Sequence, residues 1–278
     1  MNQSVGDPAG YAGYRGHSTT LVGMPAGLLA SLNFNDHPLP LHIGGTREAN
    51  RSLFERLGQS CDMAEAASCF QDYMDVLFGF EPEQRKGTGS DGRRRFRSSY
   101  LRLLKGWAFD ANSREAAVLK GWVESRFGLF PTFHKAVIGR FSAPAWMTYV
   151  EEKMANRFHN NSINMQLDLL YEFCQWALMR FHNGGHTHLT LFRGTNNFDE
   201  HPLLQRIDKH HAVIRLNNLI SFTANRDIAC EFGDYILEVA VPLVKILFFN
   251  ELLPLHALRG ESEYMVIGGD YRVKMSTL

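Results

Sequence analysis

An excess of charge of one sign and a long apolar stretch are both missing from this sequence. Its 278 residues hold 29 Lys and Arg against 29 Asp and Glu, so no net field draws the chain to nucleic acid or to anionic membranes. Apolar runs such as residues 246–249 (Ile-Leu-Phe-Phe) are far shorter than the roughly 20 residues that cross a bilayer. Residues 1–7 contain neither a basic start nor an apolar core, so we expect no signal peptide and a cytoplasmic location.

Cysteine is scarce, and the usual dinucleotide-binding fingerprint is absent. The cysteines lack the spacing of a metal or redox site, which predicts reduced residues of the core; they are Cys61, Cys69, Cys174 and Cys230. No Gly-x-Gly-x-x-Gly follows a predicted strand, so dehydrogenase chemistry is not supported.

Helical periodicity dominates the chain between residues 47 and 180. Before it, residues 1–47 are rich in Gly, Pro, His and Asn and predict ordered loop rather than regular structure, although residues 23–31 are too apolar for a disordered tail. Residues 183–185 (Asn-Gly-Gly) predict the end of the last helix, because glycine takes the left-handed turn after a helix C-terminus. Apolar residues recur at helical steps at Leu53, Leu57, Met63, Ala66, Ala67, Phe70, Met74 and Leu77, at Leu101, Leu104, Trp107 and Phe109, at Val118, Trp122, Val123 and Phe127, and at Met165, Leu169, Phe173, Trp176 and Phe181.

After residue 185 the period changes to that of strands. Residues 186–193 alternate like a strand and stop at a glycine. Residues 224–233 predict one short helix, and the remaining strands are predicted at residues 212–223, 235–241, 244–249, 264–267 and 271–275. We therefore predict an α+β fold with one domain over residues 1–278, in which a mainly helical part (1–185) packs on a mixed or antiparallel β core (186–278).

Three short polar signatures occur in order in the β part. Arg193 ends a predicted strand before Gly194, which lets a ligand approach the backbone, and a guanidinium there can bind a phosphate or carboxylate. Ser221 and Thr223 face one side of a strand, and by alternation Glu261 and Glu263 also share a side. Each signature alone has a plainer explanation: a salt bridge, hydroxyls bonded to backbone, or two solvated charges.

Taken together, the three signatures resemble the Arg-Ser-Glu class of mono-ADP-ribosyltransferases. In that class the arginine ends the first core strand, a Ser-x-Ser/Thr begins the next conserved strand, and the last glutamate lies in Glu-x-Glu. Ala229 and Phe232 are similar to the short helix that follows the serine strand in the class. Phe222 stands where the class often has threonine, and because it points away from the predicted site we expect no loss of activity.

A closer resemblance covers nearly the whole chain. Residues 16–19 (Gly-His-Ser-Thr), 21–31, 34–38 and 217–223 look like the corresponding runs of the dinitrogenase reductase ADP-ribosyltransferases. The resemblance implies transfer of ADP-ribose from NAD to one arginine of the nitrogenase iron protein, which switches nitrogen fixation off when ammonium appears or energy fails. It also implies control by a PII signalling protein.

The resemblance implies roles for the residues that hold NAD. Glu263 would bond a ribose hydroxyl and supply negative charge beneath an oxocarbenium-like cation, and Ser221 would hold that carboxylate. Arg193 would clamp the pyrophosphate or the adenosine-side ribose, and the backbone of Gly194 would hold the nicotinamide amide. Two more residues are assigned to NAD binding: Thr195 and Thr223.

The resemblance assigns Glu261 to the acceptor. It would receive the target guanidinium and help to remove its proton, which matters because a protonated guanidinium is a poor nucleophile. In the class, a glutamate at this position goes with arginine as the acceptor. NAD is then a substrate, and no metal is expected.

Other clusters have competing explanations. The basic cluster at Arg93–Arg97 is either a docking surface for an acidic protein or a solvated loop, and the zero net charge disfavours nucleic acid. His182, His186 and His188 lie near Cys174 in sequence, but a His-x-His on one strand is weak evidence for zinc. The tryptophans are most simply core residues: Trp107, Trp122, Trp146 and Trp176.

Two other functions remain open at the level of sequence. The first is an NAD glycohydrolase, or a transferase that acts on another protein or on a small guanidine. The second is a catalytically silent binding module in which the helical half makes the contacts.

Overall fold

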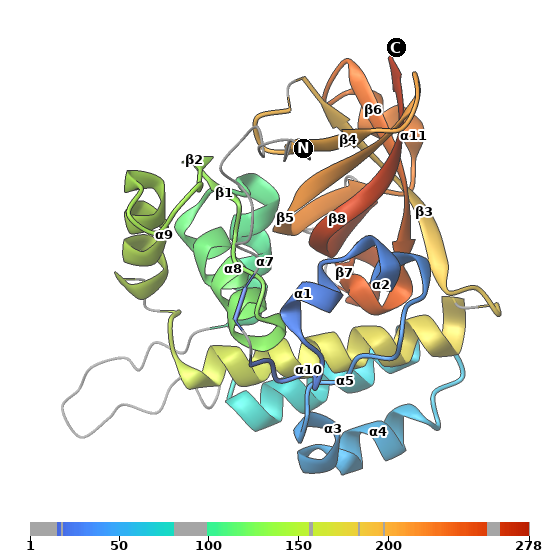
Figure 1. The fold of residues 1–278 in the computed structure, drawn as a ribbon. Helices are drawn as coiled ribbons and strands as arrows, with labels where there is room; N and C mark the ends of the chain where they lie inside the picture. Colours follow the sequence, from blue (N-terminus) through green and yellow to red (C-terminus); the bar gives the residue numbers. More distant parts are fainter. Residues whose placement is uncertain are drawn as a thin grey trace.

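The computed structural model describes residues 16–17, 19–80, 99–155, 158–182, 184–196, 198–254 and 262–277. The basic cluster at Arg93–Arg97 and the predicted acceptor residue Glu261 lie outside these residues. The described chain is mainly helical up to residue 182 and mainly β after it (Figure 1), which confirms the predicted α+β class.

Helices make up the first part and surround one long central helix. Helices occupy the stretches of residues 47–180 for which the apolar spacing predicts them, so the helical assignment there is confirmed. Three residues expected on apolar faces are nevertheless exposed: Leu77 (47%), Phe109 (83%) and Met165 (56%). No helix of the described chain is long and apolar enough to cross a membrane. The helices are α1 (Ala26–Leu29), α2 (Leu32–Asp36), α3 (Thr46–Ala49), α4 (Arg51–Leu57), α5 (Met63–Phe78), α7 (Tyr100–Phe109), α8 (Arg114–Phe127), α9 (Pro144–Ala155), α10 (Asn161–Ala177) and α11 (Arg226–Cys230).

The central helix is α10, which lies between the sheet and α5 (Figure 1). Residues on all of its faces are buried, so its polar side chains need internal partners. Gln166 accepts the backbone N–H of Tyr100 at 2.8 Å, and Glu172 accepts that of Ile43 at 2.6 Å. These bonds tie the first turn of α7 and the N-terminal segment to the same helix.

The sheet has six strands in the order β4-β5-β3-β6-β8-β7, and every pairing is antiparallel. Since β5 pairs with both β3 and β8, and β6 also pairs with both, these four strands close into a ring. The sheet strands are β3 (His188–Thr195), β4 (Leu203–Arg206), β5 (His211–Thr223), β6 (Tyr235–Pro242), β7 (Ile246–Phe249) and β8 (Glu263–Thr277), with a separate hairpin of β1 (Phe133–His134) and β2 (Ala136–Val137).

The last strand differs from its prediction, because β8 is one strand where two were expected. Gly268 lies opposite a bulge in β5 between Leu216 and Leu219, and a Cβ there would lie 1.7 Å from the carbonyl oxygen of Asn217. Gly269 has φ +127° and lies against the backbone of Ala30. The two glycines therefore permit close backbone contacts and do not end the strand.

The segment up to residue 47 was predicted as loop, and this was wrong in part, since it contains α1, α2 and the start of α3. In its apolar part Ala26, Leu29 and Ala30 are buried whereas Leu28 is exposed, and the segment packs on β8. The backbone N–H of Asp270 donates to the carbonyl of Ala30 at 2.7 Å, and Asn35 Nδ2 donates to the carbonyl of Asp270 at 2.8 Å.

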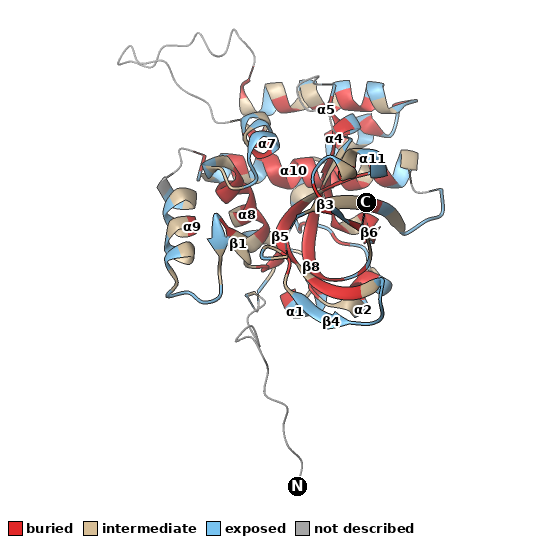
Figure 2. Cartoon of the chain, turned by 90° about the horizontal axis from the view of Figure 1, so that it is seen from above, coloured by how far each residue is buried: buried red, intermediate tan, exposed pale blue. Residues whose placement is uncertain are grey.

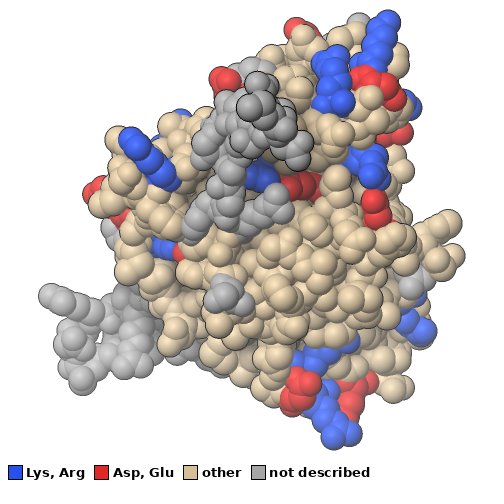
Figure 3. Space-filling view, viewed as in Figure 1, with Lys and Arg blue, Asp and Glu red and all other residues tan. Residues whose placement is uncertain are grey.

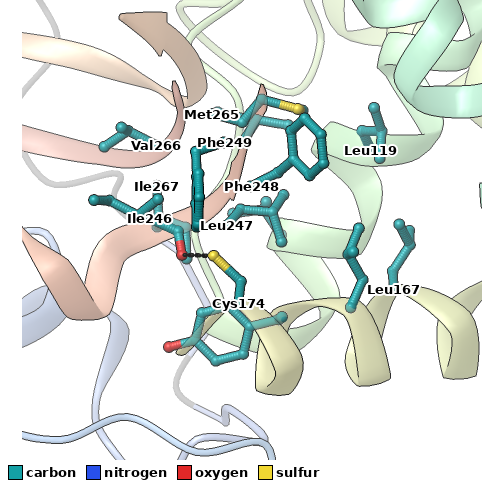
Figure 4. Close-up of a cluster of buried hydrophobic side chains, with 14 of the residues drawn as sticks. Leu119, Leu167, Cys174, Ile246, Leu247, Phe248, Phe249, Met265, Val266 and Ile267 are labelled. Carbon is teal, nitrogen blue, oxygen red and sulfur yellow. Dashed lines mark hydrogen bonds between the residues drawn. The ribbon is translucent and has the colours of Figure 1, made fainter. Parts of the chain in front are cut away.

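Buried residues concentrate in α10, β5 and β8, whereas β4 is exposed and α9 has mainly intermediate and exposed residues (Figure 2). Figure 4 shows the core between α10 and the sheet, where Cys174 Sγ donates to the carbonyl of Ile246 at 3.5 Å. All four cysteines are free thiols, but only Cys174 is buried and Cys61 is exposed, so the prediction of four core residues was wrong. Charges of both signs are mixed on the face drawn in Figure 3.

Candidate active site

The pairing of β5 with β8 brings the predicted serine and glutamate together. Thr223 lies opposite Glu263 in the register and Ser221 opposite Met265, so the side chains of Ser221 and Glu263 are diagonal neighbours on one face. The Ser221 hydroxyl donates a hydrogen bond to Oε1 of Glu263. Two residues 42 positions apart in sequence thus form one polar pair.

Residue Ser262 bears on where Glu261 can lie. Its φ is +47°, in the left-handed region that residues other than glycine adopt rarely. The alternation that predicted a shared side for Glu261 and Glu263 applies only to extended backbone, and it therefore does not extend through Ser262. The placement of Glu261 stays a prediction.

Arg193 lies beside this pair, on β3. Its Nη1 donates to the carbonyl of Ser221 at 3.0 Å, its Nε donates to Nε2 of His201 at 3.1 Å, and its Nη2 lies 3.7 Å from Oε2 of Glu200. Burial lowers the pKa of the Arg193 guanidinium below its ordinary value, while Glu200 and Glu263 act in the opposite direction. The strand does not end here as predicted, because β3 continues to Thr195.

The cavity arises where β3 and β5 separate. These two strands pair only at Phe192 and Thr223, so beyond that point their side chains diverge and leave a space of about 330 Å³. Every predicted NAD-binding or catalytic residue of the described chain lines it. The lining residues are Phe192, Arg193, Gly194, Thr195, Asn196, Glu200, Ser221, Phe222, Thr223, Ile228, Ala229, Phe232 and Glu263.

Gly194 was predicted to be glycine so that a ligand can approach its backbone, but the structure shows a different close contact. A Cβ at this position would lie 2.0 Å from the carbonyl oxygen of Ala229 and 3.0 Å from the backbone nitrogen of Gly233. The backbone that approaches Gly194 closely is therefore that of α11 and the turn after it. The glycine seats α11, which forms one wall of the cavity.

Two site residues were missed by the sequence reasoning. Trp107, interpreted as core, is buried, but its Nε1 donates to Ser221 Oγ at 2.8 Å and to Glu263 Oε1 at 2.9 Å. His201 is 1% exposed, and burial next to the positive charge of Arg193 lowers its pKa to about 3. No sequence signal distinguishes either residue. The contacts of Trp107 join segments far apart in sequence, and His201 is connected to Arg193 through a loop.

The histidines considered for zinc do not converge. His188 Nε2 lies 2.6 Å from the carbonyl oxygen of Asn35, and the ring of His182 packs edge-on against Phe249. Among the described residues, no group of three or more His, Cys, Asp or Glu side chains could hold a metal ion.

Strands β3, β5, β6 and β8 form a closed antiparallel sheet, and Arg193, Ser221 and Glu263 line the cavity where β3 and β5 separate. This is the arrangement expected of the Arg-Ser-Glu mono-ADP-ribosyltransferases. The family model described as dinitrogenase reductase ADP-ribosyltransferase matches residues 19–275. The chain belongs to that family. It is 58% identical over 265 residues to the NAD(+)–dinitrogen-reductase ADP-D-ribosyltransferase of Rhodospirillum rubrum, covering 95% of this chain and 96% of that protein. No solved structure matches the chain.

Proposed function

We propose that the protein transfers ADP-ribose from NAD to an arginine of dinitrogenase reductase, the nitrogenase iron protein. Membership of the family and the 58% identity to the Rhodospirillum rubrum enzyme support this target. The observation that carries the chemistry is the bond between Ser221 and Glu263 inside a cavity that Arg193 also lines. The modification would inactivate the iron protein reversibly and so regulate nitrogen fixation.

The first half of the reaction breaks the bond between nicotinamide and ribose. Its electron pair leaves with nicotinamide, and positive charge develops on the ribose. Glu263 supports this step, because a carboxylate held in place stabilises a cation that exists only near the transition state. Ser221 contributes by fixing one oxygen of that carboxylate.

The remaining groups of the cavity suit the other parts of NAD. Arg193 presents a guanidinium to the cavity, and this group binds the oxygens of a pyrophosphate in a fork. Phe232 lines the same cavity and is 52% exposed, so its ring can stack on a flat heteroaromatic ring. We assign Arg193 to the pyrophosphate or adenosine-side ribose, Phe232 to a base, and the backbone of Gly194 to the nicotinamide amide.

The second half of the reaction forms a bond between the ribose carbon and a nitrogen of the acceptor guanidinium, which then loses a proton. Glu261 is proposed to bind the guanidinium and take that proton. This role rests on the family resemblance and on the distance of two residues between Glu261 and Glu263.

Labelled NAD incubated with this protein and the iron protein tests the proposal. Label on an arginine of the iron protein is the expected result. Release of nicotinamide without labelled protein would indicate a glycohydrolase instead, and absence of both would leave a binding module.

Control by a PII signalling protein is part of the proposal, on the ground of the family resemblance. Adding a PII protein to the same assay should change the rate of labelling. A cytoplasmic location also goes with the proposal, since NAD and the target protein must meet in one compartment.

A further inference from the structure

Trp107 reaches the catalytic carboxylate from the helical part of the chain. Its indole N–H lies 2.8 Å from Ser221 Oγ and 2.9 Å from Glu263 Oε1, and the Ser221 hydroxyl donates to the same Oε1 atom. The indole nitrogen, the hydroxyl and the carboxylate oxygen therefore form a closed triangle, in which two donors share one carboxylate oxygen. Trp107 is 3% exposed, and hydrogen bonds to a charged group are strongest where water is excluded.

Given the proposed role of Glu263, we infer that Trp107 is a positioning residue for NAD cleavage. A hydroxyl alone leaves a carboxylate able to turn about the axis of a single hydrogen bond. A second donor from a different element, α7 rather than β5, removes that freedom and sets the direction in which Glu263 presents its charge to the ribose.

The helix that carries Trp107 is held against movement at both ends. At its start, the backbone N–H of Tyr100 donates to the buried Gln166 of α10 at 2.8 Å. Beside Trp107, a Cβ at Gly106 would lie 2.5 Å from Cβ of Glu115, so α7 and α8 are in close contact there. The helix that carries the indole is therefore held by contacts with α8 and α10, which lie outside the sheet.

Trp107 acts through Glu263 and not on the substrate. It is not among the described residues that line the cavity, so replacing it leaves the groups assigned to NAD in place. This separates its effect on turnover from any effect on NAD binding.

The decisive variant is Trp107→Phe, which keeps an aromatic ring in the core and removes the N–H. We expect kcat for both transfer and NAD hydrolysis to fall roughly 10- to 100-fold, with KM for NAD within about twofold of the wild type. The acid limb of the pH profile should move to higher pH, because a carboxylate that loses a donor takes up a proton more readily.

The matched control is Trp146→Phe, because Trp146 packs against Phe130 and Phe141 away from the cavity. It should keep the wild-type kcat and pH profile. An unchanged kcat and acid limb in Trp107→Phe would overturn the inference. If instead Glu263→Gln keeps full NAD cleavage, the proposed role of Glu263 fails. A wild-type protein that leaves the iron protein unlabelled would show that the proposed function fails, and the failures are thereby distinguished.

A spectroscopic test uses proteins that retain Trp107. In a ¹⁵N-labelled protein the four tryptophans give four indole N–H signals. The signal of Trp107, identified by its loss in Trp107→Phe or by elimination with the other three Trp→Phe variants, should shift in Glu263→Gln. A Trp107 signal that does not respond to Glu263→Gln would contradict the inference even if Trp107→Phe does not fold.

Discussion

Arg193 donates from Nε to Nε2 of His201 over 3.1 Å, and this contact determines the state of the imidazole. A nitrogen that accepts a hydrogen bond carries no proton, so His201 is neutral with its proton on Nδ1. The low pKa of His201, about 3, agrees with this state. His201 is thus a fixed acceptor that orients the guanidinium proposed to hold NAD.

Replacing His201 by phenylalanine should weaken NAD binding. The variant leaves Nε of Arg193 without its acceptor, so the guanidinium is no longer held in the orientation proposed for NAD; a loss of about 1–3 kcal/mol of binding energy corresponds to a KM for NAD raised roughly 5- to 150-fold. His201→Gln, which offers an amide oxygen, should keep most of the affinity. Steady-state kinetics of the two variants test the assignment, and an equal KM in His201→Phe and the wild type would refute it.

His201 should also make the protein sensitive to acid. Its pKa is about 3 in the folded state and about 6.5 in an unfolded chain, so below pH 6.5 the unfolded state binds the extra proton. The free energy of unfolding therefore falls as pH drops, by about 1.4 kcal/mol per pH unit from this residue until pH approaches 3. Urea unfolding at several pH values should show that the free energy of unfolding depends less steeply on pH in His201→Gln than in the wild type. The same dependence on pH in both proteins would show that His201 does not contribute.

Adding one methyl group at Gly194 should damage both stability and the cavity. The new Cβ would lie 2.0 Å from the carbonyl oxygen of Ala229, so α11 must shift, at a cost of about 1–3 kcal/mol. Gly194→Ala should lower the melting temperature and weaken NAD binding measured by calorimetry. Gly139→Ala is the control, since nothing lies within 4 Å of a Cβ there; similar behaviour of the two variants would disprove the packing argument.

The two glutamates should separate in their effects. Glu263→Gln removes the charge proposed to support cleavage and should abolish both NAD hydrolysis and transfer. Glu261→Gln should spare hydrolysis and lose arginine transfer, because only the acceptor step depends on it. Both activities are measured by nicotinamide release with and without the iron protein, and an equal loss of both in Glu261→Gln would refute this division.

Much of the fold follows from local patterns in the sequence. Apolar spacing of three and four residues predicts the helices, and the alternation after residue 185 predicts strands at β3, β5, β6 and β7. The wrong predictions concern residues whose neighbours in space are distant in sequence. Gly268 and Gly269 suggest a break in β8, yet they serve contacts with Asn217 and Ala30, and Cys61 has the chemistry of a core residue but lies on the surface.

The sequence by itself determined which residues are candidates for the active site, because Arg193, Ser221 and Glu263 lie in short motifs whose chemistry and order can be recognised along the chain. Only the tertiary structure decided how these residues are held. The antiparallel register brings Ser221 to Glu263, the split between β3 and β5 opens the cavity, and long-range packing places Trp107 and His201 behind the charged groups. Hydrogen bonds of this kind depend on side chains up to 156 positions apart, and no local pattern of residues records them.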